Sequence, residues 1–144
     1  MNLYPANSAE ATDWASISKA GAVKWRTKTS WGTAYLRNGN SDWGYVHIKR
    51  GGTYRKTSNH EVTAAAERQW VRALNSKNTS LAFNGLEVYA SHYQVGKSKK
   101  LARTMCVIYD HRSGLIGKNK YGQFGIVTAY WTTGTRNAGK CGKD

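Results

Sequence analysis

The chain has 144 residues and carries 22 Lys and Arg against 8 Asp and Glu, a formal net charge of +14 at pH 7. No apolar run is long enough to span a membrane, and the first residues lack the basic start and apolar centre of a signal peptide, so any export is expected to depend on something outside this sequence. The excess charge, spread from Lys19 to Lys143, points to a polyanionic partner and disfavours a membrane-surface helix.

The first half of the chain predicts short elements separated by turn residues. Residues 1–7 are expected to form a flexible leader and residues 8–19 a short helix. Strands are predicted over 22–28 and 31–37, followed by the tight-turn signal Asn38-Gly39. A third strand is predicted over 43–49, where apolar and polar residues alternate, and Gly51-Gly52 is expected to end it.

The second half predicts one clear helix and three longer strands. Ser58 and Glu61 form a capping-box pattern that predicts a helix over 59–74, ended at Asn75. Further strands are predicted over 86–95, 101–109 and 124–131, with a Gly/Lys-rich loop over 110–123. The predicted fold class is α+β, with N-terminal helical elements packed on a curved antiparallel β-sheet. We expect one domain over 1–131 and a flexible basic tail over 132–144. The apolar stripe of the predicted helix comprises Val62, Ala66, Trp70, Ala73 and Leu74.

The two cysteines have no spacing typical of a zinc site. Cys106 lies in an apolar strand-like run, where a buried free thiol is ordinary, and Cys141 lies in the Gly/Lys-rich tail. A disulfide between them is left open, although two free thiols are favoured.

The scarcity of acids limits the possible chemistry. Two-metal nucleases need clustered carboxylates, and the 8 acids here are not paired at short spacing. Asp110-His111 resembles the start of an HNH nuclease motif, but the downstream residues of that motif are missing. No phosphate-binding loop or nucleophile elbow is present. A cofactor-free reaction remains, in which the 2′-hydroxyl of RNA attacks the neighbouring phosphate with help from His, Lys, Arg, Tyr and Thr side chains.

Such side chains fall on one face of two predicted strands. On the strand over 43–49, Tyr45, His47 and Lys49 share a face with Trp43, and Val46 and Ile48 point to the core. Arg50 and Arg55 follow this strand. On the last strand, Thr128 and Tyr130 share a face with Phe124 and Ile126, opposite Val127, Ala129 and Trp131. Each of these residues also suits an ordinary structural or solvated position, so spacing alone does not decide their role.

Two segments carry a resemblance to a known family. GYVHIKRGG at 44–52 and GIVTAYWT at 125–132 resemble the ribonuclease domains of contact-dependent inhibition and other polymorphic bacterial toxins. Those domains belong to the barnase/EndoU/RelE-like or pancreatic-ribonuclease-like group, and many end in a strand of the form vvTAYP. The similarity covers about residues 43–132. The chain departs from the pattern at Trp131, where proline is common, and at Gly51-Gly52, where a second His often follows the Arg.

The resemblance implies a role for each candidate residue. His47 would be the general base or acid, Arg50 or Arg55 a phosphate clamp, and Thr128 and Tyr130 would position the phosphate or assist proton transfer. The second proton-transfer group stays open among Tyr130, Lys49 and His60. The residues expected to bind substrate are Lys49, Arg55, Tyr45 and His60.

The same resemblance implies a biological setting. The chain would be a monomeric endoribonuclease toxin without metal or other cofactor. It would be secreted or delivered from a cell surface and would cleave RNA, with tRNA the expected substrate, in the cytoplasm of a target bacterium. An acidic immunity protein would be its inhibitor. The main alternative is a basic nucleic-acid-binding module without catalysis, in which Tyr and Trp side chains stack on bases.

Overall fold

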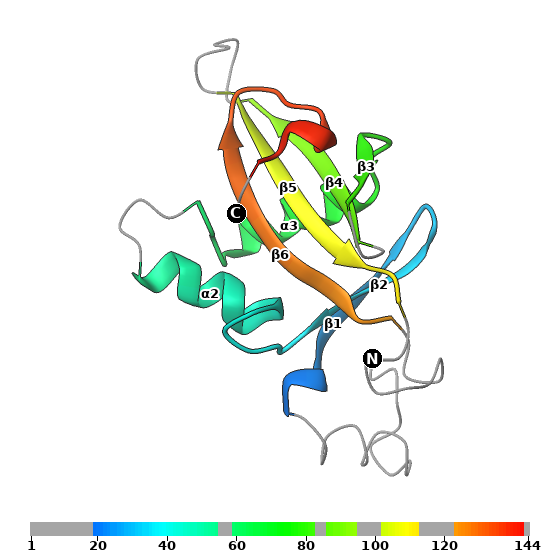
Figure 1. Cartoon of the computed structure of the whole chain (residues 1–144), viewed down its shortest axis with the longest axis vertical. Coiled ribbons are helices and arrows are strands. Elements are labelled where there is room, and N and C mark those ends of the chain that lie inside the picture. Colours follow the sequence, from blue (N-terminus) through cyan, green and yellow to red (C-terminus); the bar gives the residue numbers. More distant parts are fainter. Residues whose placement is uncertain (1–18, 55–58, 83–85, 95–101, 113–122, 143–144) are drawn as a thin grey trace.

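The computed structural model describes residues 19–54, 59–82, 86–94, 102–112 and 123–142 (Figure 1). The fold is α+β, as predicted, with two helices and two antiparallel sheets in this part of the chain. The leader over 1–7, nearly all of the helix predicted over 8–19, and Arg55 lie outside the described residues. The elements in chain order are η1 (Lys19–Gly21), β1 (Val23–Thr29), β2 (Gly32–Arg37), α2 (Gly44–Tyr54), α3 (Ala64–Leu74), β3 (Thr79–Leu81), β4 (Leu86–Tyr93), β5 (Arg103–Asp110), β6 (Gly125–Thr133) and η5 (Ala138–Lys140).

The two sheets are formed by neighbours in sequence. Strands β1 and β2 make a hairpin, and β3, β4, β5 and β6 make a four-stranded sheet in that order. The strands predicted over 22–28, 31–37, 86–95, 101–109 and 124–131 are confirmed, with ends displaced by one or two residues. The short strand β3 was not predicted, because three residues give no recognisable alternation.

Helix α3 packs on one face of the four-stranded sheet (Figure 1) and forms the main core with it and with β2. Ala66, Trp70, Ala73 and Leu74 are fully buried, which confirms these four positions of the predicted apolar stripe and the stop at Asn75. The fifth position, Val62, lies before the helix and is only partly buried. The predicted start is wrong. The helix begins at Ala64, and Thr63 is its N-cap because the Thr63 hydroxyl accepts a hydrogen bond from the Ala66 amide, at 3.0 Å.

The strand predicted over 43–49 is a helix, α2. Its buried positions, Gly44 and Ile48, are four residues apart, and Gly51 follows one turn later against His60, so the inward face has helical spacing. The alternation over 43–49 therefore misled the strand prediction. Gly51 does not end the element, although glycine disfavours a helix, because tertiary packing overrides the weak local preference. Lys49 and Tyr45 consequently lie on a different face of α2 from His47.

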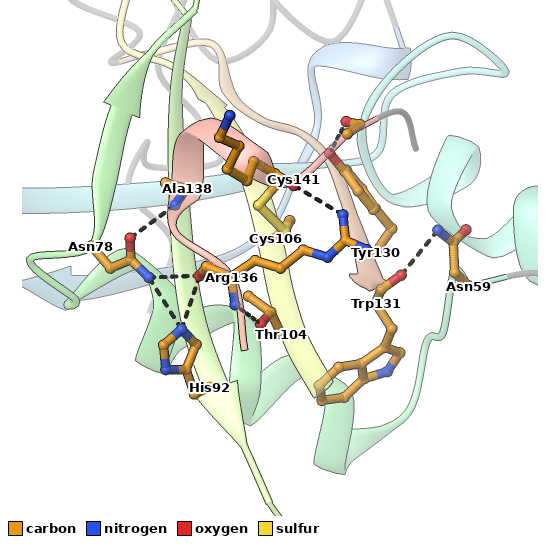
Figure 2. The surroundings of a disulfide bond; sticks show 12 residues. Asn59, Asn78, His92, Thr104, Cys106, Tyr130, Trp131, Arg136, Ala138 and Cys141 are labelled. Atoms are coloured by element: carbon orange, nitrogen blue, oxygen red, sulfur yellow. Dashed lines mark hydrogen bonds between the residues drawn. A yellow bond between two sulfur atoms is a disulfide. The ribbon is translucent and has the colours of Figure 1, made fainter. Parts of the chain in front are cut away.

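The chain after β6 folds back over the other face of the four-stranded sheet (Figure 1). Cys106 of β5 and Cys141 form a disulfide, so the expectation of two free thiols is wrong. Figure 2 shows Asn78 and His92 directed at the backbone of Arg136; the Asn78 amide donates to the Arg136 carbonyl at 3.0 Å. The residues expected to form a flexible tail are therefore held, as far as residue 142, by hydrogen bonds and by the disulfide at Cys141.

Candidate active site

The candidate site begins with a bulge in β6. Ile108 pairs with Thr128, but the next residue of β5, Tyr109, pairs with Ile126, so Val127 is an extra residue in the ladder. Such a bulge changes which side chains share a face. Ile126 therefore joins Ala129 in the main core instead of lying beside Thr128, which corrects the predicted face.

His60 is held at the outer edge of β6. The Trp131 amide donates to the Asn59 carbonyl at 2.8 Å, and the Asn59 side-chain amide donates to the Trp131 carbonyl at 3.0 Å (Figure 2). The segment before α3 is thereby fixed along the strand. On its other side, Gly51 of α2 permits close approach, since a Cβ at this position would lie 2.7 Å from Cγ of His60. The His60 ring is therefore confined between α2 and β6.

The hydrogen bonds of His60 assign its ring nitrogens. Nδ1 lies 3.0 Å from Oδ1 of Asn59, and Nε2 lies 3.3 Å from Oγ1 of Thr128. Because the Asn59 oxygen can only accept, Nδ1 carries the proton and the Thr128 hydroxyl donates to Nε2. His60 and Thr128 are 6% and 3% exposed, so this is an interior pair.

His47 lies beside His60, from a different element. The two rings are 5.3 Å apart between centroids and meet edge to face at 86°. Nδ1 of His47 lies 2.9 Å from the carbonyl oxygen of Ser41. This acceptor requires a proton on Nδ1, which in the neutral ring places the lone pair on Nε2. His47 is half-buried and is thus the more accessible histidine of the pair.

Tyr130 of β6 lies beside His60 and is the fourth residue of this group, with His47, His60 and Thr128. Its ring centroid is 6.1 Å from that of His60, and its hydroxyl donates to the Gly142 carbonyl at 2.7 Å. Only 1% of Tyr130 is exposed, because the disulfide-bonded segment covers it (Figure 2). Of the predicted site residues, the structure therefore brings together His47, His60, Thr128 and Tyr130.

The other predicted residues of α2 are arranged differently. Arg50 is exposed one turn after His47. The ring of Tyr45 contacts cations on a separate surface, with the Lys24 ammonium 4.3 Å and the Lys49 ammonium 5.9 Å from its centroid. The structure thus separates Tyr45 and Lys49 from the histidine pair, because the two sets lie on different faces of one helix.

A second ionisable cluster lies where β4 begins and β5 ends, and the sequence predictions missed it. Nε2 of His111 is 3.2 Å from Oε1 of Glu87 and 2.8 Å from the Tyr89 hydroxyl. The Gln123 amide lies 3.2 Å from Nδ1 of His111, and its oxygen accepts from the Tyr109 hydroxyl. Glu87 pairs with Tyr109 in the register of β4 and β5. This register places Glu87 and Tyr89 close to His111, two residues after Tyr109. The sequence signal for this cluster is the adjacent Asp110 and His111, which by themselves resemble only the start of a metal-binding motif.

The surroundings of this cluster favour its uncharged histidine. Burial lowers the pKa of His111 below its ordinary value, against the opposing effect of the Glu87 carboxylate. Burial and the hydrogen bond to Glu87 raise the pKa of Tyr89. About a quarter of the Glu87 side chain and 29% of the His111 side chain remain exposed, so solvent reaches the pair.

No family model, curated protein or solved structure matches this chain. Within the described ranges, no three His, Cys, Asp or Glu side chains gather in a way that could hold a metal ion. No helix in the same ranges is long and apolar enough to cross a membrane. The two histidine clusters and the excess positive charge are therefore the features of this chain that bear on its function.

Proposed function

We propose that this chain is an endoribonuclease that cleaves RNA without a metal ion, through attack of the 2′-hydroxyl on the adjacent phosphate. The observation that carries the proposal is the meeting of His47 and His60, from separate segments, with their rings 5.3 Å apart. Two adjacent imidazoles supply both the base and the acid that this reaction needs. The net charge of +14 suits a polyanionic substrate.

The proposed reaction assigns one proton transfer to each histidine. Nε2 of His47 removes the 2′-hydroxyl proton, the 2′-oxygen forms a bond to phosphorus, and the bond from phosphorus to the 5′-oxygen breaks. His60, protonated on both ring nitrogens, donates the Nε2 proton to the departing 5′-oxygen, and the Thr128 hydroxyl turns away from Nε2 in this step. Arg50, one turn after His47, stabilises the negative charge of the phosphate.

Thr128 and Tyr130 act in this scheme as positioning residues. Both are almost wholly buried, and the Thr128 hydroxyl lies 3.3 Å from Nε2 of His60. The contact between the Thr128 hydroxyl and Nε2 of His60 favours an effect of Thr128 through this ring. The proposed acid–base pair therefore depends on β6 for its orientation.

The biological setting that we propose rests on the resemblance of residues 44–52 and 125–132 to polymorphic toxin domains of the barnase/EndoU/RelE-like group. The chain would act in the cytoplasm of a target bacterium after secretion or cell-surface delivery, with tRNA as its substrate. An acidic immunity protein would inhibit it in the producing cell. Such a partner would associate fastest at low salt, because opposite charges steer the encounter.

The Glu87 and His111 pair is a competing location for the same reaction. A carboxylate and an imidazole 3.2 Å apart also form an acid–base pair, and both are partly exposed. A basic nucleic-acid-binding module without catalysis is the alternative function, and it is supported by the same positive charge. Substitution of the two histidine clusters separates these possibilities.

The test is incubation of the purified protein with total cellular RNA, with and without millimolar EDTA. We expect cleavage in both conditions, 5′ fragments ending in a 2′,3′-cyclic phosphate or its monophosphate, and 3′ fragments with a free 5′-hydroxyl. RNA with a 2′-methoxy group and single-stranded DNA should bind but stay intact. A 5′-phosphate on the 3′ fragment, or cleavage that EDTA stops and Mg²⁺ restores, would overturn the 2′-hydroxyl mechanism. Binding without cleavage would support the non-catalytic module.

A further inference from the structure

A shallow groove, widely open to solvent, lies between β1 and α3, outside both histidine clusters. It has a volume of about 490 Å³. One wall is the helix face formed by Ala64, Glu67, Arg68 and Val71, which recur at helical spacing. The other wall is β1, and the indole Nε1 of Trp25 donates to Oε1 of Glu67 at 2.9 Å across the groove. This hydrogen bond fixes the orientation of the Trp25 ring against the helix.

The groove combines apolar and cationic side chains. Trp25, Ala64 and Val71 offer apolar surface, while Arg26 and the exposed Arg68 flank it from opposite walls. A flat aromatic ring with an attached negative charge fits this combination, because stacking needs the indole and the charge needs the guanidinium groups. A nucleotide within a single strand has both features.

The positive charge continues along β1 into a second hollow of about 520 Å³, lined also by Lys24 and Lys28. Among the described residues that line the two hollows, four are cationic and Glu67 is the one carboxylate. Lys24 in turn lies over the ring of Tyr45 on α2, where Lys49 follows. These cationic side chains form a path from α3 across β1 to α2, along which they can neutralise successive phosphates of a nucleic-acid strand.

We infer that the β1–α3 groove binds one unstacked base of single-stranded RNA against Trp25, with Arg26 and Arg68 holding the adjoining phosphates. This inference rests on the proposed function and names the form of its substrate. Duplex RNA keeps its bases stacked and paired, so it cannot place a base in the groove. The groove thus selects loops and single strands.

The experiment is fluorescence anisotropy with a labelled single-stranded 2′-methoxy RNA oligonucleotide, which the proposed reaction does not cleave. Arg68→Glu should weaken binding at least tenfold and reduce its salt dependence. Lys140→Glu makes the same charge change on the opposite face of the sheet and should weaken binding much less. Trp25→Leu should weaken binding about tenfold, whereas Trp25→Phe keeps a ring but loses the hydrogen bond to Glu67 and should weaken binding less than Trp25→Leu. Circular dichroism confirms that each variant is folded.

The outcomes distinguish the groove from the proposed activity. Equal weakening by Arg68→Glu and Lys140→Glu, or equal affinity for single-stranded and duplex oligonucleotides, would overturn the inference. Absence of RNA binding by the wild type would also overturn it, and would leave an acidic protein as the occupant. If the groove variants weaken binding while the wild type never cleaves unmodified RNA, the inference stands and the proposed function fails.

Discussion

Nε2 of His60 lies 3.3 Å from the hydroxyl of Thr128, although 68 residues separate the two in sequence. The pair joins the segment before α3 to β6 and sets the ring beside His47. The proposed acid–base geometry depends on this contact.

Thr128→Val should therefore lower the RNA cleavage rate on the order of tenfold, the effect of losing one hydrogen bond of about 1.4 kcal/mol. Thr128→Ser keeps the hydroxyl and should restore most of the rate. The measurement is single-turnover cleavage, with the His60 imidazole signals followed by NMR. Equal rates for the Val and Ser variants would contradict a positioning role.

His47→Ala should lower the cleavage rate by about 10²-fold or more, the usual scale for a general acid or base. Because His47 is half-buried and outside the main core, the fold should persist. His111→Ala, assayed in parallel, should retain most of the activity. The reverse pattern, with His111 essential and His47 dispensable, would move the active site to the Glu87 cluster.

Gly51→Ala should displace the His60 ring, since the added Cβ would lie 2.7 Å from its Cγ. Alanine normally stabilises a helix by about 0.5–1 kcal/mol relative to glycine, and the clash should cancel that gain. We expect slower cleavage and shifted His60 imidazole signals. Gly139→Ala is the matched control, because its Cβ would meet only Ser80, at 3.3 Å and beyond, and should leave cleavage unchanged.

Removing the disulfide by the double substitution Cys106→Ala and Cys141→Ala should lower the free energy of unfolding by about 4 kcal/mol. The bond links residues 35 apart, and its loss restores conformational entropy to the unfolded chain. Urea denaturation of the oxidised wild type, the reduced wild type and the variant measures the effect. Equal free energies of unfolding for all three would contradict the prediction, and would show that the hydrogen bonds to the backbone of Arg136 hold the C-terminal residues without the disulfide.

Stability should fall as the pH decreases below 6.5, in part through His111. Burial lowers the pKa of this imidazole in the folded protein, so the unfolded chain binds a proton first. The stabilising contribution is present above pH 6.5 and is lost as the pH falls toward the folded-state pKa. His111→Gln should weaken this dependence in urea titrations from pH 5 to 8, and NMR titration should give a His111 pKa below 6.5. A value above 6.5 would contradict the argument.

Local sequence patterns were sufficient for the five longer strands, β1, β2, β4, β5 and β6, and for the buried face of α3. Residues 86–95 and 101–109 alternate or are continuously apolar over a full strand length, and Trp70 and Leu74 recur at helical spacing. Residues 43–49 are too few to distinguish the two-residue period of a strand from the 3.6-residue period of a helix. Packing against β6 and His60 selected the helix, and this choice separated Tyr45 and Lys49 from His47.

The sequence by itself determined the α+β class and the strongly basic character, because composition and periodicity are local properties. It nominated His47, Thr128 and Tyr130 only through the resemblance to toxin domains, and their roles stay a prediction. Only the tertiary structure decided that His60 is the partner of Thr128, that Cys106 pairs with Cys141, and that Glu87 meets His111. These contacts join residues distant in sequence. These contacts depend on three features of the folded chain: the strand register, the extra residue Val127 and the close approach that Gly51 permits. None of these features can be recognised from residue spacing along the sequence.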